Sequence, residues 1–95
     1  MIVKLVYKVG SGDILSEELL KLQKENEGLV VQTYDAGYYK SKKDAIQIKA
    51  SCGAGLVPFC AIYNNDKELV KAFYSEVGEC TFVNISKYIK TWLKY

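Results

Sequence analysis

The sequence predicts an α/β domain whose sheet contains both parallel and antiparallel strands. Its first half alternates strand-like and helix-like patterns, and strands connected through a helix run parallel. Its second half holds two strand-like segments separated by a short polar turn, which is the pattern of an antiparallel hairpin. An amphipathic segment at the end predicts a C-terminal helix. The length of 95 residues fits a single domain, residues 1–95, with one core.

Alternating apolar side chains predict a first strand over residues 2–9. Lys4 is unexpected there, because a central strand is usually covered on both faces. The sequence Gly-Ser-Gly-Asp at 10–13 then opens a helix. Ser11 or Asp13 is the expected N-cap of this helix, since both side chains can accept a hydrogen bond from a free N–H of the first turn.

Leucines at helical spacing continue this helix, and a strand rich in valine and threonine follows at residues 29–34. The next helix is predicted over residues 42–52. Ser41 and Asp44 stand at the spacing of a capping box, with Asp in place of the usual Glu or Gln. Because residues 45–49 also alternate, a short strand is the other interpretation of this segment.

A lone proline lies at the start of the predicted hairpin. The first hairpin strand spans residues 57–63 and includes Pro58, although proline lacks the N–H that a strand interior requires. An Asn-Asn-Asp-Lys turn follows at 64–67, and the second strand spans residues 68–74, with charged residues suited to a sheet edge. Asn84 is the expected N-cap of the last helix.

The resulting order, β-α-β-α-β-β-α, resembles the core of the thioredoxin-like superfamily at about the length of a glutaredoxin. The segment Gly55-Leu56-Val57-Pro58-Phe59 is similar to the family's cis-proline pattern, G-[IV]-[VIR]-P-[TF]. The resemblance implies a four-stranded mixed sheet flanked by helices, with the first and third strands antiparallel neighbours and the middle helix alone on one face. It also implies a cis Val57–Pro58 bond that turns the main chain of Val57 outward, where an extended peptide can add a short strand.

The loop at residues 10–14 departs from that family. Its sequence, Gly-Ser-Gly-Asp-Ile, stands where the family has G-C-x-x-C, so Ser11 and Ile14 occupy the positions of the nucleophilic and resolving cysteines, give or take one position. Thiol–disulfide exchange needs an attacking thiolate and a resolving thiol, and neither residue supplies one. The resemblance therefore implies a redox-inactive binding module rather than a dithiol oxidoreductase. Its expected partner is a protein or an extended peptide, bound at Ser11, Gly12, Val57 and Pro58.

Two alternatives stay open. The hydroxyl of Ser11 and the helix N-terminus beside it could bind glutathione, because some glutathione transferases resemble this chain in having a serine near that position. The segment 78–81 departs from the G-G-x-D loop with which glutaredoxins hold glutathione, because Thr81 replaces the aspartate. Cys52, at the end of a helix, is the candidate reactive thiol of a single-thiol redox protein. Cys60 lies within a strand, where its thiol is expected to be buried and inert.

Composition argues against several other classes of function. The chain has no histidine and no Cys-x-x-C pair, so we expect no metal site, no imidazole-based catalysis and no cofactor. A net charge of +2 with scattered lysines gives no support for nucleic-acid binding. No apolar run reaches the roughly 20 residues of a membrane span, and Met1 leads directly into the first strand, so neither a membrane segment nor a signal peptide is expected. Three cysteines (Cys52, Cys60 and Cys80) leave one unpaired in any disulfide scheme, which favours the reducing cytoplasm.

Overall fold

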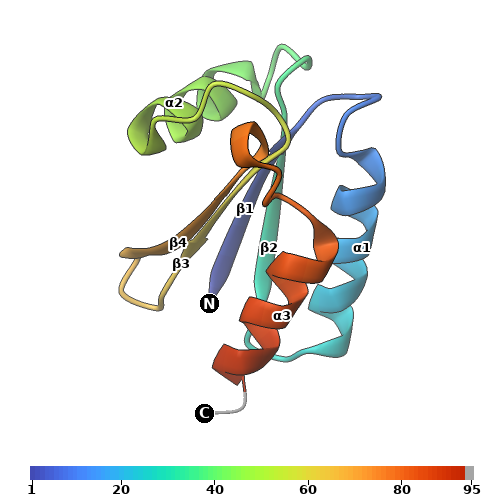
Figure 1. Cartoon of the computed structure of the whole chain (residues 1–95), viewed down its shortest axis with the longest axis vertical. Coiled ribbons are helices and arrows are strands. Elements are labelled where there is room, and N and C mark those ends of the chain that lie inside the picture. The colour runs from blue at the N-terminus through green and yellow to red at the C-terminus, as the bar shows by residue number, and fades with distance from the viewer. Residues whose placement is uncertain (94–95) are drawn as a thin grey trace.

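A computed structural model of the chain, which describes residues 1–93, places a four-stranded mixed sheet between helices on its two faces (Figure 1). The order of elements is the predicted β-α-β-α-β-β-α, with one short 3-10 helix, η1, added after the last strand. The elements are β1 (Ile2–Tyr7), α1 (Asp13–Glu25), β2 (Val30–Asp35), α2 (Lys42–Cys52), β3 (Phe59–Tyr63), β4 (Leu69–Tyr74), η1 (Ser75–Val77) and α3 (Phe82–Leu93).

The strands lie side by side in the order β2-β1-β3-β4. β1 runs parallel to β2, as a strand–helix–strand unit requires, and Val3 lies opposite Val31. β1 runs antiparallel to β3, with Leu5 opposite Cys60. The hairpin of β3 and β4 is antiparallel and leaves β4 at one edge of the sheet, which confirms the expected edge strand.

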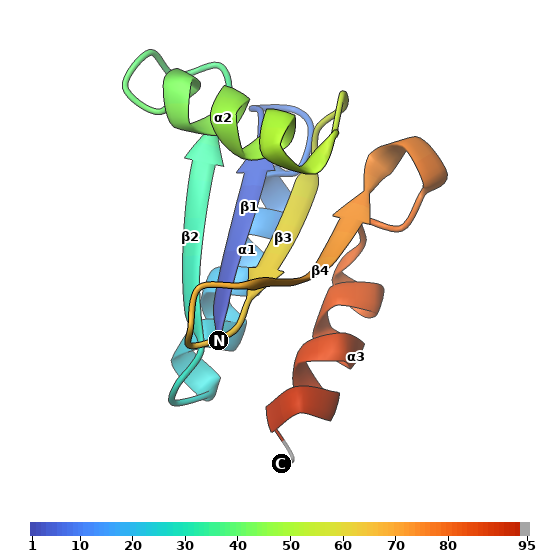
Figure 2. The ribbon, with the colours of Figure 1, turned by 90° about the vertical axis from the view of Figure 1, so that its left-hand side faces the viewer.

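The core has two layers, because successive side chains of a strand point to opposite faces of the sheet. The helices α1 and α3 cover one face and α2 crosses the other (Figure 2). The first layer is buried between the sheet and α1 and α3, and the second between the sheet and α2. The first contains Val3, Leu5, Leu19, Cys60, Ile62, Ile85 and Ile89, and the second contains Val6, Ala45, Ile48, Phe59 and Ala61.

Three strands are shorter than the sequence predicts, β4 by only one residue, since it begins at Leu69 rather than at residue 68. β1 ends at Tyr7 rather than at residue 9, because Lys8 and Ser11 exchange main-chain hydrogen bonds of 2.7 and 3.1 Å and turn the chain back. β3 begins at Phe59 rather than at residue 57. Pro58 has no N–H to donate, so the ladder begins at the residue after it.

The predicted N-cap of α1 is wrong. Gly12 occupies the N-cap position with a φ of +106°, and no side chain caps this end of the helix. The hydroxyl of Ser11 points instead to another loop. The carboxylate of Asp13 accepts the main-chain N–H of Gly10 at 2.9 and 3.0 Å and thereby closes the loop before the helix.

Of the other two predicted caps, Ser41 is confirmed only in part and Asn84 is wrong. Ser41 is the N-cap residue of α2, as predicted, but its hydroxyl donates to the carbonyl of Asp35 at 2.8 Å and does not cap the helix, so the capping box with Asp44 is absent. The last helix begins at Phe82, before Asn84. Asn84 therefore lies in its first turn, where its main-chain N–H donates to the side chain of the preceding threonine, Thr81, at 3.3 Å.

Over residues 1–93, no helix combines the length and the apolar character that crossing a bilayer would require.

The two-layer core predicts a sharp difference between two adjacent leucines of α1. Leu19 is fully buried and Leu20 is only partly buried at the margin of the same layer. Leu19→Ala should lower the free energy of unfolding by about 2–5 kcal/mol, because it leaves a cavity in a close-packed site. Leu20→Ala, the matched control, should cost clearly less. Urea unfolding monitored by circular dichroism measures both, and equal losses would contradict this description of the core.

Candidate functional site

Two loops meet at the end of the sheet where β1 finishes and β3 begins. One is the loop between β1 and α1, and the other is the loop between α2 and β3. The hydroxyl of Ser11 donates to the carbonyl of Val57 at 3.4 Å. Gly12 lies against the ring of Pro58. The structure thus brings together the four residues that the sequence predicts as a binding site, and we call Ser11, Gly12, Val57 and Pro58 the Val57 surface.

The close approach of the loops depends on the absence of a side chain at Gly12. A Cβ atom built there would lie 3.0 Å from the Cβ of Pro58 and 3.0 Å from the Cβ of Tyr7. Both distances are shorter than ordinary carbon–carbon contacts. The residue also has a positive φ, which side chains disfavour. Glycine is therefore required for packing and for backbone conformation at the same position.

The main chain of Val57 is the part of this surface that offers hydrogen bonds. The Val57–Pro58 peptide bond is cis. Val57 is half-buried, and within residues 1–93 its N–H has no hydrogen-bond acceptor. Its carbonyl accepts the Ser11 hydroxyl at 3.4 Å, a distance well beyond the usual range of about 2.7–2.8 Å for such bonds. An incoming donor can therefore replace the Ser11 hydroxyl at little cost.

Side chains from β4 and η1 hold the loop that carries Val57. The hydroxyl of Tyr74 donates to the carbonyl of Cys52 at 2.6 Å, where α2 ends. The hydroxyl of Ser75 donates to the carbonyl of Pro58. These contacts are not predicted from the sequence, because their acceptors are main-chain carbonyls of a loop that is distant along the chain.

Glu76 adds a third anchor. Its carboxylate accepts the main-chain N–H of Gly55 at 3.0 Å. This hydrogen bond lowers the pKa of the Glu76 carboxyl, because the N–H stabilises the charged form. A lowered pKa means that the anchor is complete at neutral pH and is lost only as the pH falls through that lowered value.

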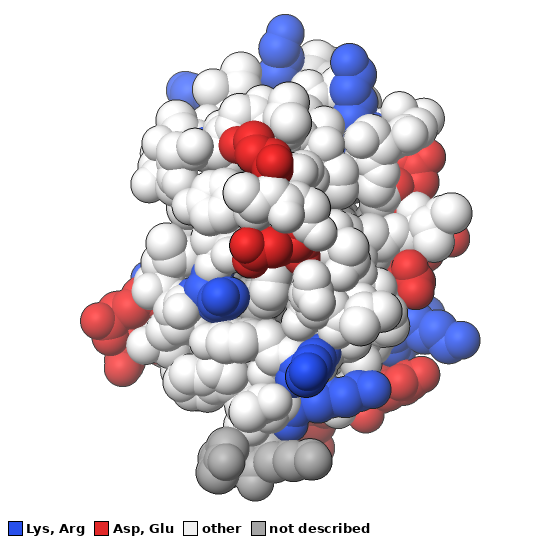
Figure 3. Space-filling view, in the orientation of Figure 1, with Lys and Arg blue, Asp and Glu red and all other residues white. Residues whose placement is uncertain are grey.

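Exposed apolar side chains surround the Val57 surface. Val9 and Ile14 flank the first loop and are 76% and 74% exposed, and Leu56 in the second loop is 54% exposed. Val77 of η1, next to the Glu76 anchor, is also largely exposed. On the face drawn in Figure 3, positive and negative side chains are interspersed, without an extended patch of one sign. The exposed apolar side chains beside the two loops can therefore contact a ligand at the Val57 surface.

The helix N-terminus beside Ser11 already carries a negative charge. The carboxylate of Asp13 lies in the first turn of α1, where the helix dipole favours an anion. A ligand thiolate approaching Ser11 would meet this charge. This charge disfavours Ser11 as a site for the glutathione thiolate.

All three cysteines are free thiols. Burial raises the pKa of Cys80 to about 12, and burial, followed by the neighbouring Cys80, raises the pKa of Cys60 well above its ordinary value. Cys60 is fully buried, as predicted. Cys52 is half-buried, with its sulfur 3.7 Å from the hydroxyl oxygen of Ser51. This hydroxyl is neutral, and a reactive thiol is typically activated by a cation.

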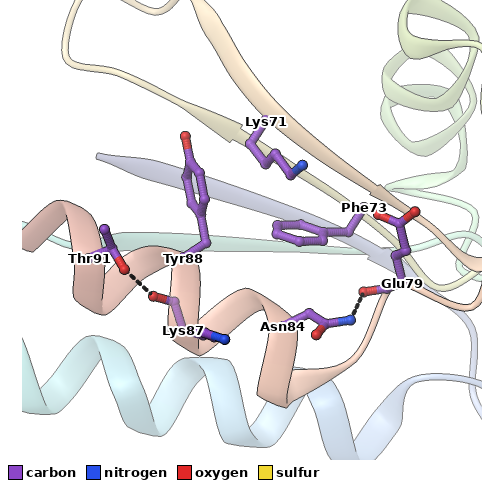
Figure 4. Close-up of a pocket in the computed structure, with 7 residues that line it drawn as sticks. All are labelled: Lys71, Phe73, Glu79, Asn84, Lys87, Tyr88 and Thr91. Atoms are coloured by element: carbon purple, nitrogen blue, oxygen red, sulfur yellow. Dashed lines mark hydrogen bonds between the residues drawn. The ribbon is translucent and has the colours of Figure 1, made fainter.

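A groove of about 400 Å³ lies elsewhere, between β4 and α3 (Figure 4). Its floor includes Phe73, and the ammonium of Lys71 lies 5.4 Å from the centre of that ring. The side chains of Asn84 and Thr91 donate to main-chain carbonyls of their own segment. The groove therefore offers ring surface, two lysine side chains and the carboxylate of Glu79.

Metal binding finds no support in the described part of the chain, where no three His, Cys, Asp or Glu side chains are grouped to hold an ion.

No protein-family model matches this sequence, and neither a curated protein nor a solved structure matches it. What the site can do must therefore be argued from its own residues.

The close contact of Gly12 with Pro58 and Tyr7 predicts a large cost of adding a side chain there. Gly12→Ala should lower the free energy of unfolding by more than Gly10→Ala does. Both glycines have positive φ, which costs an alanine about 1–2 kcal/mol, but the added methyl group meets no atom within 4 Å at Gly10. Overpacking against Pro58 and Tyr7 should add about 1–3 kcal/mol at Gly12. Urea unfolding of the two variants gives the comparison, and equal costs would show that the loops can separate freely.

Burial of the thiols generates the third prediction. In the native protein at about pH 8, a thiol reagent such as dithionitrobenzoate should label Cys52 and leave Cys60 and Cys80 unmodified, because burial keeps both protonated and out of contact with the reagent. Denaturant should release all three thiols. Cys52→Ser should abolish the native reaction. Rapid native labelling of Cys60 or Cys80, identified by mass spectrometry, would contradict the burial described here.

Proposed function

We propose that this protein is a redox-inactive, thioredoxin-like binding module that takes up an extended peptide, or an extended segment of a partner protein, at the Val57 surface. The observation that carries this proposal is the main chain of Val57, with an N–H unpaired within residues 1–93 and a carbonyl held only by a long hydrogen bond. An extended peptide running antiparallel to this segment would pair with both groups, as in other cases of strand addition.

The arrangement of elements supports the thioredoxin-like type. The antiparallel pairing of β1 with β3 places the start of β3 beside the loop that opens α1. The helices α1 and α3 lie on one face of the sheet and α2 on the other, as expected for that family. A cis proline precedes β3. These features agree with the likeness of the segment Gly55–Phe59 to the family's pattern.

The exposed apolar residues supply a second component of binding. Side chains of an added strand alternate between the two sides, so every second side chain of the peptide would face the protein. Val9 and Ile14, which flank the first loop, and Leu56, next to Val57 in the second loop, are exposed and offer apolar contacts. We therefore propose peptides with apolar residues at alternate positions as the preferred ligands.

The same site lacks the groups for thiol–disulfide exchange. Ser11 and Ile14 stand at the positions where the family carries its two cysteines, and Cys60 and Cys80 are buried on the α1 and α3 side of the sheet. Binding at the Val57 surface would therefore be reversible and non-covalent. We place the protein in the reducing cytoplasm, where its three thiols stay free.

The test begins with peptides selected from a random library on immobilised protein and mapped by chemical-shift changes in labelled protein. The changes should centre on Ser11, Gly12 and the segment 55–59. N-methylation of the peptide amide that pairs with the Val57 carbonyl should weaken binding about tenfold or more, since it removes a main-chain hydrogen bond and adds bulk. Methylation of the neighbouring amide, which faces away, should have little effect.

Ile14→Ala should weaken the binding of the same peptides. Ile46→Ala is the matched control and should leave binding unchanged, because Ile46 is an exposed isoleucine on α2. Glutathione at millimolar concentration should give no binding heat in isothermal titration. Shifts centred on the groove between β4 and α3, or equal effects of methylation at every amide, would overturn the proposal. Glutathione binding that Ser11→Ala abolishes would favour the glutathione alternative instead.

A further inference from the structure

A second cavity lies on the face of the sheet that α2 crosses, away from α1 and α3. It measures about 270 Å³ and is formed by strands β1, β2 and β3 together with α2. It is lined almost entirely by polar side chains, and its apolar member, Ile48, is buried. The polar side chains are Lys4, Tyr34, Asp44, Gln47, Ser51 and Tyr63.

Lys4 is the unusual member of this set. It lies in the central strand β1, between Gln32 of β2 and Ala61 of β3, and it is half-buried. Its ammonium lies 5.0 Å from the centre of the Tyr63 ring. A cation over a ring face is held by the ring's electrostatic field, but the three N–H donors of the ammonium receive no acceptor from it. The positive charge in this cavity therefore has unused hydrogen-bonding capacity.

The opposite wall of the cavity offers acceptors. Asp44 lies in the first turn of α2, and no ion pair joins it to Lys4 in the described part of the chain. Burial, and then the charge of Asp44, raise the pKa of the Tyr34 hydroxyl, which places this hydroxyl within the field of the carboxylate. The Tyr34 hydroxyl donates its proton to the side-chain oxygen of Gln32 at 3.1 Å. Its lone pairs remain free to accept.

Ser51 belongs to the same wall. Its hydroxyl donates to the carbonyl of Ile48 at 2.9 Å, so it too presents lone pairs. The cavity thus contains both signs of charge: the ammonium of Lys4 comes from β1, the carboxylate of Asp44 and the hydroxyl of Ser51 come from α2, and the hydroxyl of Tyr34 comes from β2. The amide of Gln47 can serve either side, since it carries both donors and an acceptor.

We propose that this cavity binds a small zwitterion of the amino-acid type, with its carboxylate on Lys4 and its ammonium on Asp44. A ligand with both charges can pair with Lys4 and with Asp44 at once. A simple anion would pair with Lys4 only and would be repelled by the carboxylate of Asp44. The volume lies just below the range of about 300–1,000 Å³ that is typical of ligand pockets, which suits a ligand of few atoms. This site is independent of the Val57 surface.

The experiment compares three probes by chemical-shift titration of isotope-labelled protein at constant ionic strength: glycine, acetate and methylammonium. Glycine should produce saturable shifts at Lys4, Asp44 and Gln47. Its dissociation constant should be about tenfold or more below those of acetate and methylammonium, because it makes two charge-assisted contacts instead of one.

Two variants test the contributions of Lys4 and Asp44 to glycine binding separately. Lys4→Met keeps the aliphatic stem and should reduce glycine binding to the level of methylammonium. Asp44→Asn is nearly isosteric on an exposed helical residue and should reduce glycine binding to the level of acetate. Lys71→Met is the matched control, because Lys71 also lies over an aromatic ring but outside this cavity, and it should bind glycine as the wild type does.

Absence of saturable shifts in the wild type would overturn the proposal, and so would unchanged glycine binding in Lys4→Met. Equal affinity of the wild type for glycine and acetate would also overturn it, since the Asp44 wall would then contribute nothing. Should Lys4→Met fail to fold, which its amide spectrum would reveal, Asp44→Asn still decides the question.

Discussion

The structure depends on the contact between Gly12 and Pro58. The start of α1 and the start of β3 are far apart in sequence, yet a Cβ at Gly12 would come within 3.0 Å of the proline ring. This contact fixes the two loops side by side. Val57 and Pro58 are both only half-buried, and the N–H of Val57 has no hydrogen-bond acceptor within residues 1–93, so this part of the second loop stays accessible. A binding surface made of backbone groups needs such a rigid support, because backbone groups cannot be repositioned by a change of side-chain rotamer.

The elements could be predicted from the sequence, while the side-chain hydrogen bonds that cap the helices could not. The helical or alternating spacing of apolar residues predicts segments such as 42–52, because it indicates which side chains will be buried. Cap predictions depend on a short polar side chain that has several partners within reach. Ser11 bonds to Val57 and Ser41 bonds to Asp35, so in both cases a tertiary or loop acceptor replaces the free N–H of the helix.

The candidate site was predictable as a set of residues but not as a set of interactions. The position of Pro58 before an apolar strand and the Gly-Ser-Gly sequence after the first strand indicate the two loops that meet. The anchors from Tyr74, Ser75 and Glu76 have no such sign, because their acceptors and donors are main-chain groups of a distant loop. The accessible main chain of Val57 is expected only from the family resemblance, since the pattern of side chains alone does not indicate which backbone groups are left unpaired.

The presence of Lys4 in a central strand follows from the shape of α2. This helix has 11 residues and lies across the ends of β2, β1 and β3 rather than along them (Figure 2). Val6, near the end of β1, is buried beneath it, while Lys4, two residues earlier on the same face, lies at the margin of that cover. The expectation that a central strand excludes charge assumes a helix that covers its whole length. Where the helix is short and transverse, the uncovered half of the face can hold a cation, and here it forms one wall of a polar cavity.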